Sequence, residues 1–303
     1  MPVAQVIAAF GRQYLARLAD GSEMTCLTRG KKSEVACGDI VEVRRTDHPS
    51  IRHGAAVATE LLPSAQGVIE SILPRSSLLH RSDAYRGKVI AANVTQIIVV
   101  VAAEPSFNDE LLARCLVAAY DQKLEVLIVL NKCDLLEAAA AAHKRLAPYS
   151  AIGYRVLEIS ARQDVSRLRP LLTGHSSVLV GQSGMGKSTL INALLPDAQA
   201  VTREISSALD SGKHTTTHAR LYRLDDTSCM IDCPGVQAFG LHHLSFGRIE
   251  QGFVEFAQYL GQCRFHDCHH LHEPGCALRS AVEAGKIDAR RLALFQHITA
   301  APH

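Results

Sequence analysis

The N-terminal part of the chain alternates apolar and polar positions over short stretches that glycine and charged residues separate. A period of two is typical of strands that bury one face. Gly38 and Asp39 come directly before the run 40–43, which is the pattern of a turn that leads into a strand. We expect strands at 3–10, 14–18 and 39–43. The pattern therefore predicts a small all-β domain over residues 1–66.

From about residue 89 the pattern changes to longer apolar runs that alternate with helical segments. Such runs are typical of parallel strands buried on both faces and connected by crossover helices. We expect strands at 96–102, 126–130, 155–159, 177–180 and 230–231, and helices at 109–120, 138–146 and 165–172, the last capped by Asp164. Residues 201–218 show little periodicity and are expected to form a long mobile loop. The sequence predicts an α/β domain over residues 67–240 and mainly helical segments over 241–303.

Residues 181–188 form a phosphate-binding motif, Gly-x-x-x-x-Gly-Lys-Ser, between a predicted strand and a predicted helix. The glycines let backbone N–H groups converge on phosphate oxygens, and the helix start adds partial positive charge. Lys187 is expected to reach the β- and γ-phosphates, and the Ser188 hydroxyl to ligate Mg²⁺. The candidate residues are Gly181, Gln182, Ser183, Gly184, Met185, Gly186, Lys187, Ser188 and Thr189.

A second motif, Asn-Lys-Cys-Asp at 131–134, ends a predicted buried strand and can identify the base. The phosphate motif contacts no base atom, so it does not distinguish GTP from ATP. Asp134 can accept hydrogen bonds from the N1–H and the exocyclic amine of guanine, a donor pair that adenine lacks. Lys132 would lie along the base, and Asn131 would support the loop. The candidate guanine-binding residues are Asn131, Lys132, Cys133, Asp134, Ser160 and Ala161.

The segment Asp-Cys-Pro-Gly at 232–235 follows another predicted strand and is expected to sense the terminal phosphate. Asp232 would hold Mg²⁺ through water, and the Gly235 N–H would contact the γ-phosphate. One threonine of residues 215–217 is expected to add a hydroxyl ligand, and Thr216 is our candidate. Position 236 is Val, which cannot orient a water molecule, so hydrolysis should be slow alone or use another group. His214 and a residue of a partner are the candidates for that group.

Three cysteines and a histidine, Cys263-x4-Cys268-x-His270-x5-Cys276, lie within a short segment near the C-terminus. Three thiolates and one imidazole suit a closed tetrahedral Zn²⁺ site with a structural role. His266, His269 and His272 are alternative nitrogen ligands.

Composition and charge narrow the function without naming a partner. The chain has 303 residues, is 47% hydrophobic and carries a formal charge of only +2, so nucleic-acid binding must be argued locally. Residues 1–52 hold eight Lys or Arg and six Asp or Glu, which a solvated surface also explains. The longest apolar run, 97–103, is too short to cross a membrane, and no signal-peptide pattern is evident. We expect a cytoplasmic protein.

The guanine motif precedes the phosphate motif, whereas most GTPases have the opposite order, so a circular permutation is expected. With the β segment before these motifs and the Cys/His segment after them, essentially the whole chain resembles ribosome small-subunit-dependent GTPase A, the RsgA or YjeQ family. The resemblance implies an N-terminal OB-fold barrel, a circularly permuted P-loop GTPase domain and a zinc-binding C-terminal domain. It also implies hydrolysis stimulated by the small ribosomal subunit, whose rRNA the protein contacts during late maturation. His214 matches the family's proposed catalytic histidine.

Two other functions remain open at this point. A P-loop kinase or ATPase would explain residues 181–188 and would bind ATP and GTP equally well, but it leaves residues 131–134 unexplained. A non-catalytic RNA-binding scaffold would explain Val236 and the C-terminal segment. We expect a monomeric GTP hydrolase that uses GTP/GDP, Mg²⁺ and Zn²⁺ and acts on the small ribosomal subunit.

Overall fold

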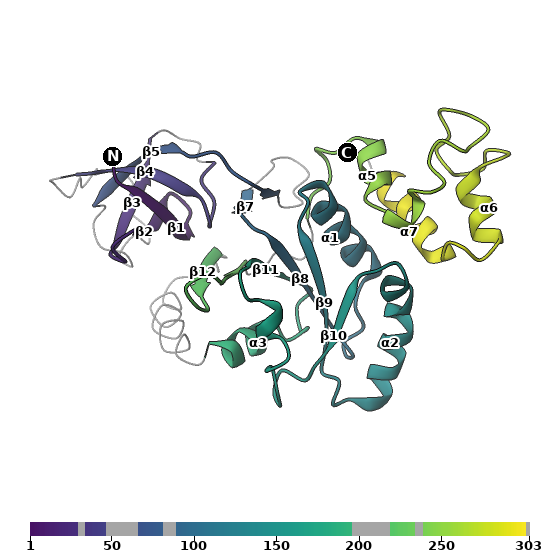
Figure 1. Cartoon of the computed structure of the whole chain (residues 1–303), viewed down its shortest axis with the longest axis horizontal. Coiled ribbons are helices and arrows are strands. Elements are labelled where there is room, and N and C mark those ends of the chain that lie inside the picture. The colour runs from purple at the N-terminus through teal and green to yellow at the C-terminus, as the bar shows by residue number, and fades with distance from the viewer. Residues whose placement is uncertain (30–33, 47–65, 81–88, 196–218, 234–238, 301–303) are drawn as a thin grey trace.

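The structure is a computed structural model that describes residues 1–29, 34–46, 66–80, 89–195, 219–233 and 239–300. A β-barrel and a group of C-terminal helices lie at opposite ends of a central α/β domain (Figure 1). This architecture confirms the predicted fold class. Within the described ranges, no helix is long and apolar enough to cross a membrane.

Five strands close into the N-terminal barrel, with the order β1-β2-β3-β5-β4 and a final pairing between β4 and β1. Strands β3 and β5 are parallel and the other neighbours antiparallel, an arrangement that fits the OB-fold. The strands are β1 (Val3–Phe10), β2 (Gln13–Leu18), β3 (Glu23–Thr28), β4 (Ile40–Arg45) and β5 (Gly67–Ile72). Inward-facing residues such as Val6, Ala16 and Val43 are fully buried. Because β5 bonds to β3 and β4, the barrel extends past residue 66.

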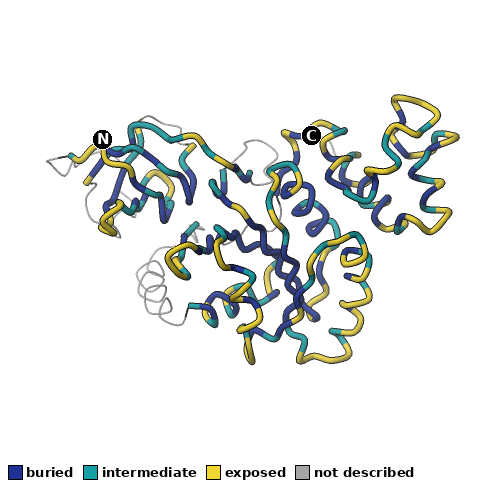
Figure 2. The backbone as a smooth tube through the Cα atoms, in the orientation of Figure 1, coloured by how far each residue is buried: buried dark blue, intermediate teal, exposed yellow. Residues whose placement is uncertain are grey.

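The central sheet has the order β10-β9-β8-β11-β13-β12. Its parallel strands are β8 (Gln96–Ala102), β9 (Glu125–Asn131), β10 (Arg155–Glu158), β11 (Ser176–Val180) and β13 (Cys229–Asp232), and β12 (Ala219–Arg223) is antiparallel. Every residue of β8 is buried, as the dark blue centre of Figure 2 shows. The chain order reverses between the neighbours β8 and β11. In open α/β sheets, ligands bind at the carboxyl ends of the strands at such a reversal.

In the described part of the chain, a helix follows each of three parallel strands. Helices α1 (Asp109–Asp121) and α2 (Leu136–Ala151) follow β8 and β9 and lie on one face of the sheet, and α3 (Lys187–Leu194) lies on the other (Figure 1). Right-handed crossovers put these helices on opposite faces, because the chain advances across the sheet in one direction from β8 and in the other direction from β11. Asn108 caps α1 by accepting hydrogen bonds from the N–H groups of Glu110 and Leu111.

The helix expected at 165–172 is wrong, since only a 3-10 turn, η1 (Arg169–Leu171), forms there. Asp164 accepts from the backbone N–H and the hydroxyl of Ser166, which closes a local turn instead of capping a helix. Pro170 has no N–H to donate, so a longer helix through this segment would lose a bond. The loop expected at 201–218 lies outside the described residues.

The barrel and the central sheet are joined by backbone pairing. Strand β1 pairs with the edge strand β12, with Ala8 opposite Arg220 and Ala9 opposite Ala219, so the two units form one eleven-stranded sheet. A second contact involves the hairpin of β6 (Leu78–His80) and β7 (Val89–Ala92). At that contact Gly38 has a φ of +94°, and a Cβ added there would lie 2.2 Å from the carbonyl oxygen of Ala92.

The C-terminal helices are α5 (Phe246–Gln251), η2 (Val254–Phe256), α6 (Ala277–Glu283) and α7 (Ala289–Ala300). They pack around the fully buried rings of Phe253, Phe256 and Phe295. Helices α5 and α7 also contact α1 of the central domain. The C-terminal helices therefore share an interface with the central domain.

We expect Gly38→Ala to lower the free energy of unfolding by about 2–4 kcal/mol, because left-handed backbone strain adds to overpacking against β7. Gly21→Ala is the matched control: its φ is +85°, and an added Cβ meets nothing within 4 Å. That variant should lose only about 1–2 kcal/mol. Urea unfolding followed by circular dichroism measures both, and equal losses would contradict the close approach between Gly38 of the barrel and β7.

Candidate functional site

A cavity of about 520 Å³ lies where the parallel strands β9, β10 and β11 end, and its size suits a small-molecule ligand. Both motifs found in the sequence contribute to it, although they are far apart along the chain. Its lining residues are Asn131, Lys132, Asp134, Leu135, Ser160, Ala161, Arg162, Ser183, Gly184, Gly186, Lys187, Ser188 and Thr189. The structure thus brings the guanine motif and the phosphate motif to one site.

Asn131 connects the two motifs through its side-chain amide. Its Nδ2 donates to the carbonyl oxygen of Met185 at 3.0 Å, and its Oδ1 accepts from the Ala161 N–H at 2.9 Å. The side chain is 2% exposed. Both halves of the amide are therefore used, and a buried polar group of this kind is costly to remove without replacement.

Asp134 is exposed at the other end of the cavity and accepts a hydrogen bond from the Ser160 hydroxyl at 2.5 Å. This hydrogen bond holds the pKa of Asp134 below its usual value. The carboxylate is thus ionised at neutral pH and acts only as an acceptor. Lys132 has a φ of +63°, and its Nζ donates to the carbonyl oxygen of Glu104 at 2.7 Å. That bond fixes the direction of the Lys132 stem.

The phosphate loop begins helix α3 with Gly186 as the N-terminal cap. Gly186 has a φ of +90°, and a Cβ there would lie 2.3 Å from Asn131 Nδ2, so glycine is needed for the contact between the motifs. The Lys187 ammonium donates to the carbonyl oxygens of Gly181 and Gln182 at 2.6 and 2.8 Å. Its charge is therefore held over the loop.

Asp232 ends β13 on the phosphate side of the site. Burial raises the pKa of Asp232, while the charge of Lys187 acts in the opposite direction. Burial likewise lowers the pKa of Lys187, and Asp232 opposes that shift. The two half-buried groups stabilise each other as an ammonium and a carboxylate, which are the charges that a phosphate and its cation require.

Some candidate residues from the sequence have other positions. Five described candidates for nucleotide binding do not line the cavity: Cys133, Gly181, Gln182, Met185 and Asp232. The side chain of Gln182 instead accepts a hydrogen bond from the Asn108 N–H at 2.9 Å. His214, Thr216 and Gly235 lie outside the described residues.

The sequence interpretation missed two lining residues, Leu135 and Arg162. Each directly follows residues that were chosen, Asp134 and Ala161. Extending each motif by one position would have found them, because a loop that reads a base presents successive residues to it. Arg162 supplies a planar cation, which can stack on an aromatic base.

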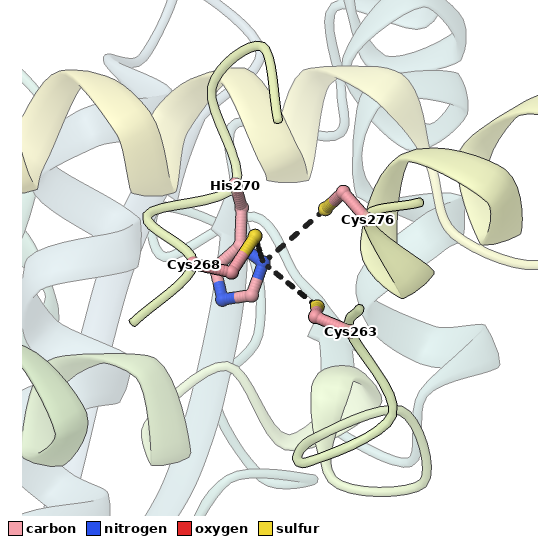
Figure 3. Close-up of side chains that lie close together, drawn as sticks. All are labelled: Cys263, Cys268, His270 and Cys276. Carbon is pink, nitrogen blue, oxygen red and sulfur yellow. Dashed lines mark hydrogen bonds between the residues drawn. The ribbon is translucent and has the colours of Figure 1, made fainter. Parts of the chain in front are cut away.

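The four residues of the C-terminal cluster lie together, with all ligand atoms within 4.8 Å of one another (Figure 3). His270 Nδ1 is 3.6, 3.5 and 3.3 Å from the sulfur atoms of Cys263, Cys268 and Cys276. A tetrahedral Zn²⁺ with ordinary bond lengths requires sulfur–nitrogen separations of about 3.5 Å. The cluster therefore has the dimensions of a closed zinc site.

The other nearby histidines, His266, His269 and His272, are exposed and lie outside this cluster. Burial raises the pKa of the Cys268 thiol to about 12 in the protein alone. A cation bound here would favour the thiolate form of Cys268. The geometry thus favours His270 as the nitrogen ligand.

We expect Asn131→Ala to lower the free energy of unfolding by about 2–4 kcal/mol, because it leaves the Ala161 N–H and the Met185 carbonyl without their partner. Ser160→Ala, which removes an exposed hydrogen bond in the same cavity, should cost under about 1 kcal/mol. Chemical denaturation without nucleotide gives both values. Similar losses of unfolding free energy for the two variants would contradict the structural role of Asn131.

Residues 72–242 match the family model described as RsgA GTPase. A Nitrosospira multiformis protein named "Small ribosomal subunit biogenesis GTPase RsgA" is 53% identical over 296 residues, which cover 98% of this chain and 90% of that protein. The crystal structure of YjeQ from Thermotoga maritima aligns with a TM-score of 0.71 at 27% identity, covering 99% of both chains. The structure of YloQ, titled a circularly permuted GTPase, shares the fold with a TM-score of 0.67 at 24% identity, covering 99% of this chain and 94% of that one. This chain belongs to the RsgA GTPase family and is a GTP-hydrolysing enzyme.

Proposed function

We propose that the cavity between residues 131–134 and 181–189 is the GTP site, and that the enzyme acts in the biogenesis of the small ribosomal subunit. The observation that carries the first part is the Asn131–Met185 hydrogen bond, which joins a base-reading loop to a phosphate loop. The second part rests on the name of relatives such as the Nitrosospira multiformis protein, which shares half its residues with this chain.

Guanine is identified at the Asp134 end of the cavity. The carboxylate accepts from the N1–H and the exocyclic amine, and Ser160 supports it through the hydroxyl. The Lys132 stem and the Arg162 side chain line the cavity and would cover the base. The Ala161 N–H is already bonded to Asn131 Oδ1, so the guanine carbonyl would take its donor from the neighbouring backbone. Adenine would leave Asp134 without donors, which is the basis for discrimination.

Phosphate is bound at the other end by the N–H groups of residues 183–188, the start of α3 and the Lys187 ammonium. Ser188 lines the cavity, and Asp232 is a half-buried carboxylate that interacts electrostatically with Lys187, so the two residues would suit a hydroxyl ligand and a water-mediated ligand of Mg²⁺. When bound, Mg²⁺ would neutralise charge on the β- and γ-phosphates. Thr216 and Gly235 are assigned to the metal and the γ-phosphate on sequence grounds only.

Hydrolysis is assigned to His214, also on sequence grounds, as the group that orients the attacking water. Val236 stands where a glutamine would otherwise do so. An enzyme without a fixed water-orienting group is slow until a partner places one, so we expect the small subunit to stimulate hydrolysis.

The Cys263, Cys268, His270 and Cys276 cluster is proposed to hold Zn²⁺ as a structural ion.

We further propose that the protein contacts rRNA of the small subunit, works as a cytoplasmic monomer, and divides into domains near residues 72 and 240. The first of these limits follows the end of β5 at Ile72.

We expect Asp134→Asn to weaken GDP binding roughly 100-fold or more, because an amide replaces one charged acceptor with a donor. Xanthine carries an oxygen where guanine has its amine, so the variant should bind XDP better than GDP. Isothermal titration of GDP, XDP and ADP against both proteins measures this. Equal affinity of the unaltered protein for ADP and GDP would contradict the guanine assignment.

We expect purified small ribosomal subunits to raise the GTPase rate at least about tenfold, and His214→Ala to remove roughly 100-fold from the stimulated rate with nucleotide binding intact. The control is His143→Ala, which changes an exposed histidine on α2. Single-turnover measurements with γ-labelled GTP give the rates. Absence of stimulation would count against the partner, whereas an unchanged His214→Ala rate would exclude only that residue.

A further inference from the structure

Glu250 on α5 contacts the cluster of Cys263, Cys268, His270 and Cys276 but is not one of the four candidate metal ligands. Its Oε1 lies 2.5 Å from Nε2 of His270, and the two side chains are only 17% and 5% exposed. The other nitrogen of the same ring, Nδ1, faces the three sulfur atoms (Figure 3). The imidazole is thus held between a carboxylate on one side and thiols on the other.

This contact fixes how the ring presents itself to a cation. A carboxylate only accepts hydrogen bonds, so the ring proton belongs on Nε2, and the Nδ1 lone pair is left directed at the sulfur atoms. A carboxylate partner also makes the imidazole a stronger electron donor toward a metal. Glu250 therefore has the position and the chemistry of a group that orients a metal-ligating histidine.

The backbone at His270 needs such support. Its φ is +62°, which is uncommon and strained for a residue other than glycine. Gln296 on α7 donates from Nε2 to the His270 carbonyl oxygen, and the ring of Phe246 on α5 lies nearly parallel to the imidazole, with 6.4 Å between ring centroids. Helices α5 and α7 thus stabilise the strained conformation of His270, which the loop that carries it would not stabilise alone.

Helix α5 also contacts the central domain. Arg248, two residues before Glu250, forms an ion pair with Asp121 at the end of α1, with Nη2 and Oδ1 2.7 Å apart. Ile249 between them is fully buried. Successive side chains of α5 therefore face the central domain, the hydrophobic core and the cluster.

We propose that Glu250 is a positioning residue that orients His270 for metal binding through Nδ1. Through Glu250, the packing of α5 against α1 depends on whether the metal is bound. The proposal rests on the zinc site under "Proposed function". A bound cation fixes His270, His270 fixes Glu250, and Glu250 fixes the helix that carries Arg248. Metal binding at the cluster thereby affects the central domain through α5, although the cluster itself does not contact that domain.

Zinc affinity of the full-length protein tests the positioning role, measured by competition with a chromophoric chelator. We expect Glu250→Ala to weaken binding roughly 10- to 100-fold, and Glu250→Gln, which keeps an acceptor oxygen, to recover most of that loss. Glu283→Ala removes an exposed carboxylate from the same group of helices and should bind as the unaltered protein does. If the unaltered protein takes up no zinc, the zinc site itself fails; if it binds zinc and Glu250→Ala binds equally well, the positioning role fails.

The background His270→Cys separates positioning from general support of the fold. A four-cysteine site has no ring to orient, so adding Glu250→Ala there should leave zinc affinity unchanged. A loss as large as in the native background would show that Glu250 only stabilises the fold, and would overturn the proposal.

Hydrogen exchange tests the link to α5. Zinc should slow exchange of the amides in residues 246–251 of the unaltered protein and of Glu283→Ala. In Glu250→Ala saturated with zinc, that protection should be absent while the loop 263–276 remains protected. Equal protection of 246–251 in all three proteins would contradict the dependence of α5 on metal loading.

Discussion

The side-chain amide of Asn131 is the contact on which the nucleotide cavity depends, because it joins loops that follow three different parallel strands. Asn131 is the last residue of β9, donates to the loop after β11 and accepts from the loop after β10. The two residues of its bond to Met185 are 54 positions apart in the chain. The bond requires only that the strand ends meet at one edge of the sheet. A circular permutation preserves that edge, so the reversed order of the motifs leaves the site intact.

The permutation instead changes what lies next to Asp232. Strand β13, which ends at Asp232, pairs with β12, and β12 pairs in turn with β1 of the barrel. On the other side, the chain continues from β13 to α5, which contacts α1. The barrel is therefore attached beside Asp232, the residue proposed to hold Mg²⁺ through water, and the C-terminal helices follow Asp232 in the chain. Partner binding to the barrel has a short physical route to the phosphate side of the cavity.

The sequence predicted the features that depend on local pattern and missed those that depend on packing between distant segments. Buried runs located β8 and β9, and short motifs located the cavity residues. The helix expected at 165–172 failed because Pro170 and the Asp164 turn override its periodicity. The pairing of β1 with β12 and the contact of Glu250 with His270 have no signal in either segment alone, since each joins residues whose own neighbours are ordinary.

The two appended units are attached to the central domain by different kinds of contact. Arg291 on α7 is 3% exposed, forms an ion pair with the buried Glu255 at 2.6 Å, and lies 5.1 Å from the centre of the Tyr149 ring on α2. Separating α7 from α2 would remove a desolvated cation–π contact of about 2 kcal/mol, in addition to the apolar area buried there. The barrel pairs with the central sheet at two positions of β12, contacts the β6–β7 hairpin at Gly38, and contributes Ile7 and Cys37 to the hydrophobic core of the central domain. The C-terminal helices are therefore held by buried side-chain contacts, and the barrel by backbone pairing and a shared core.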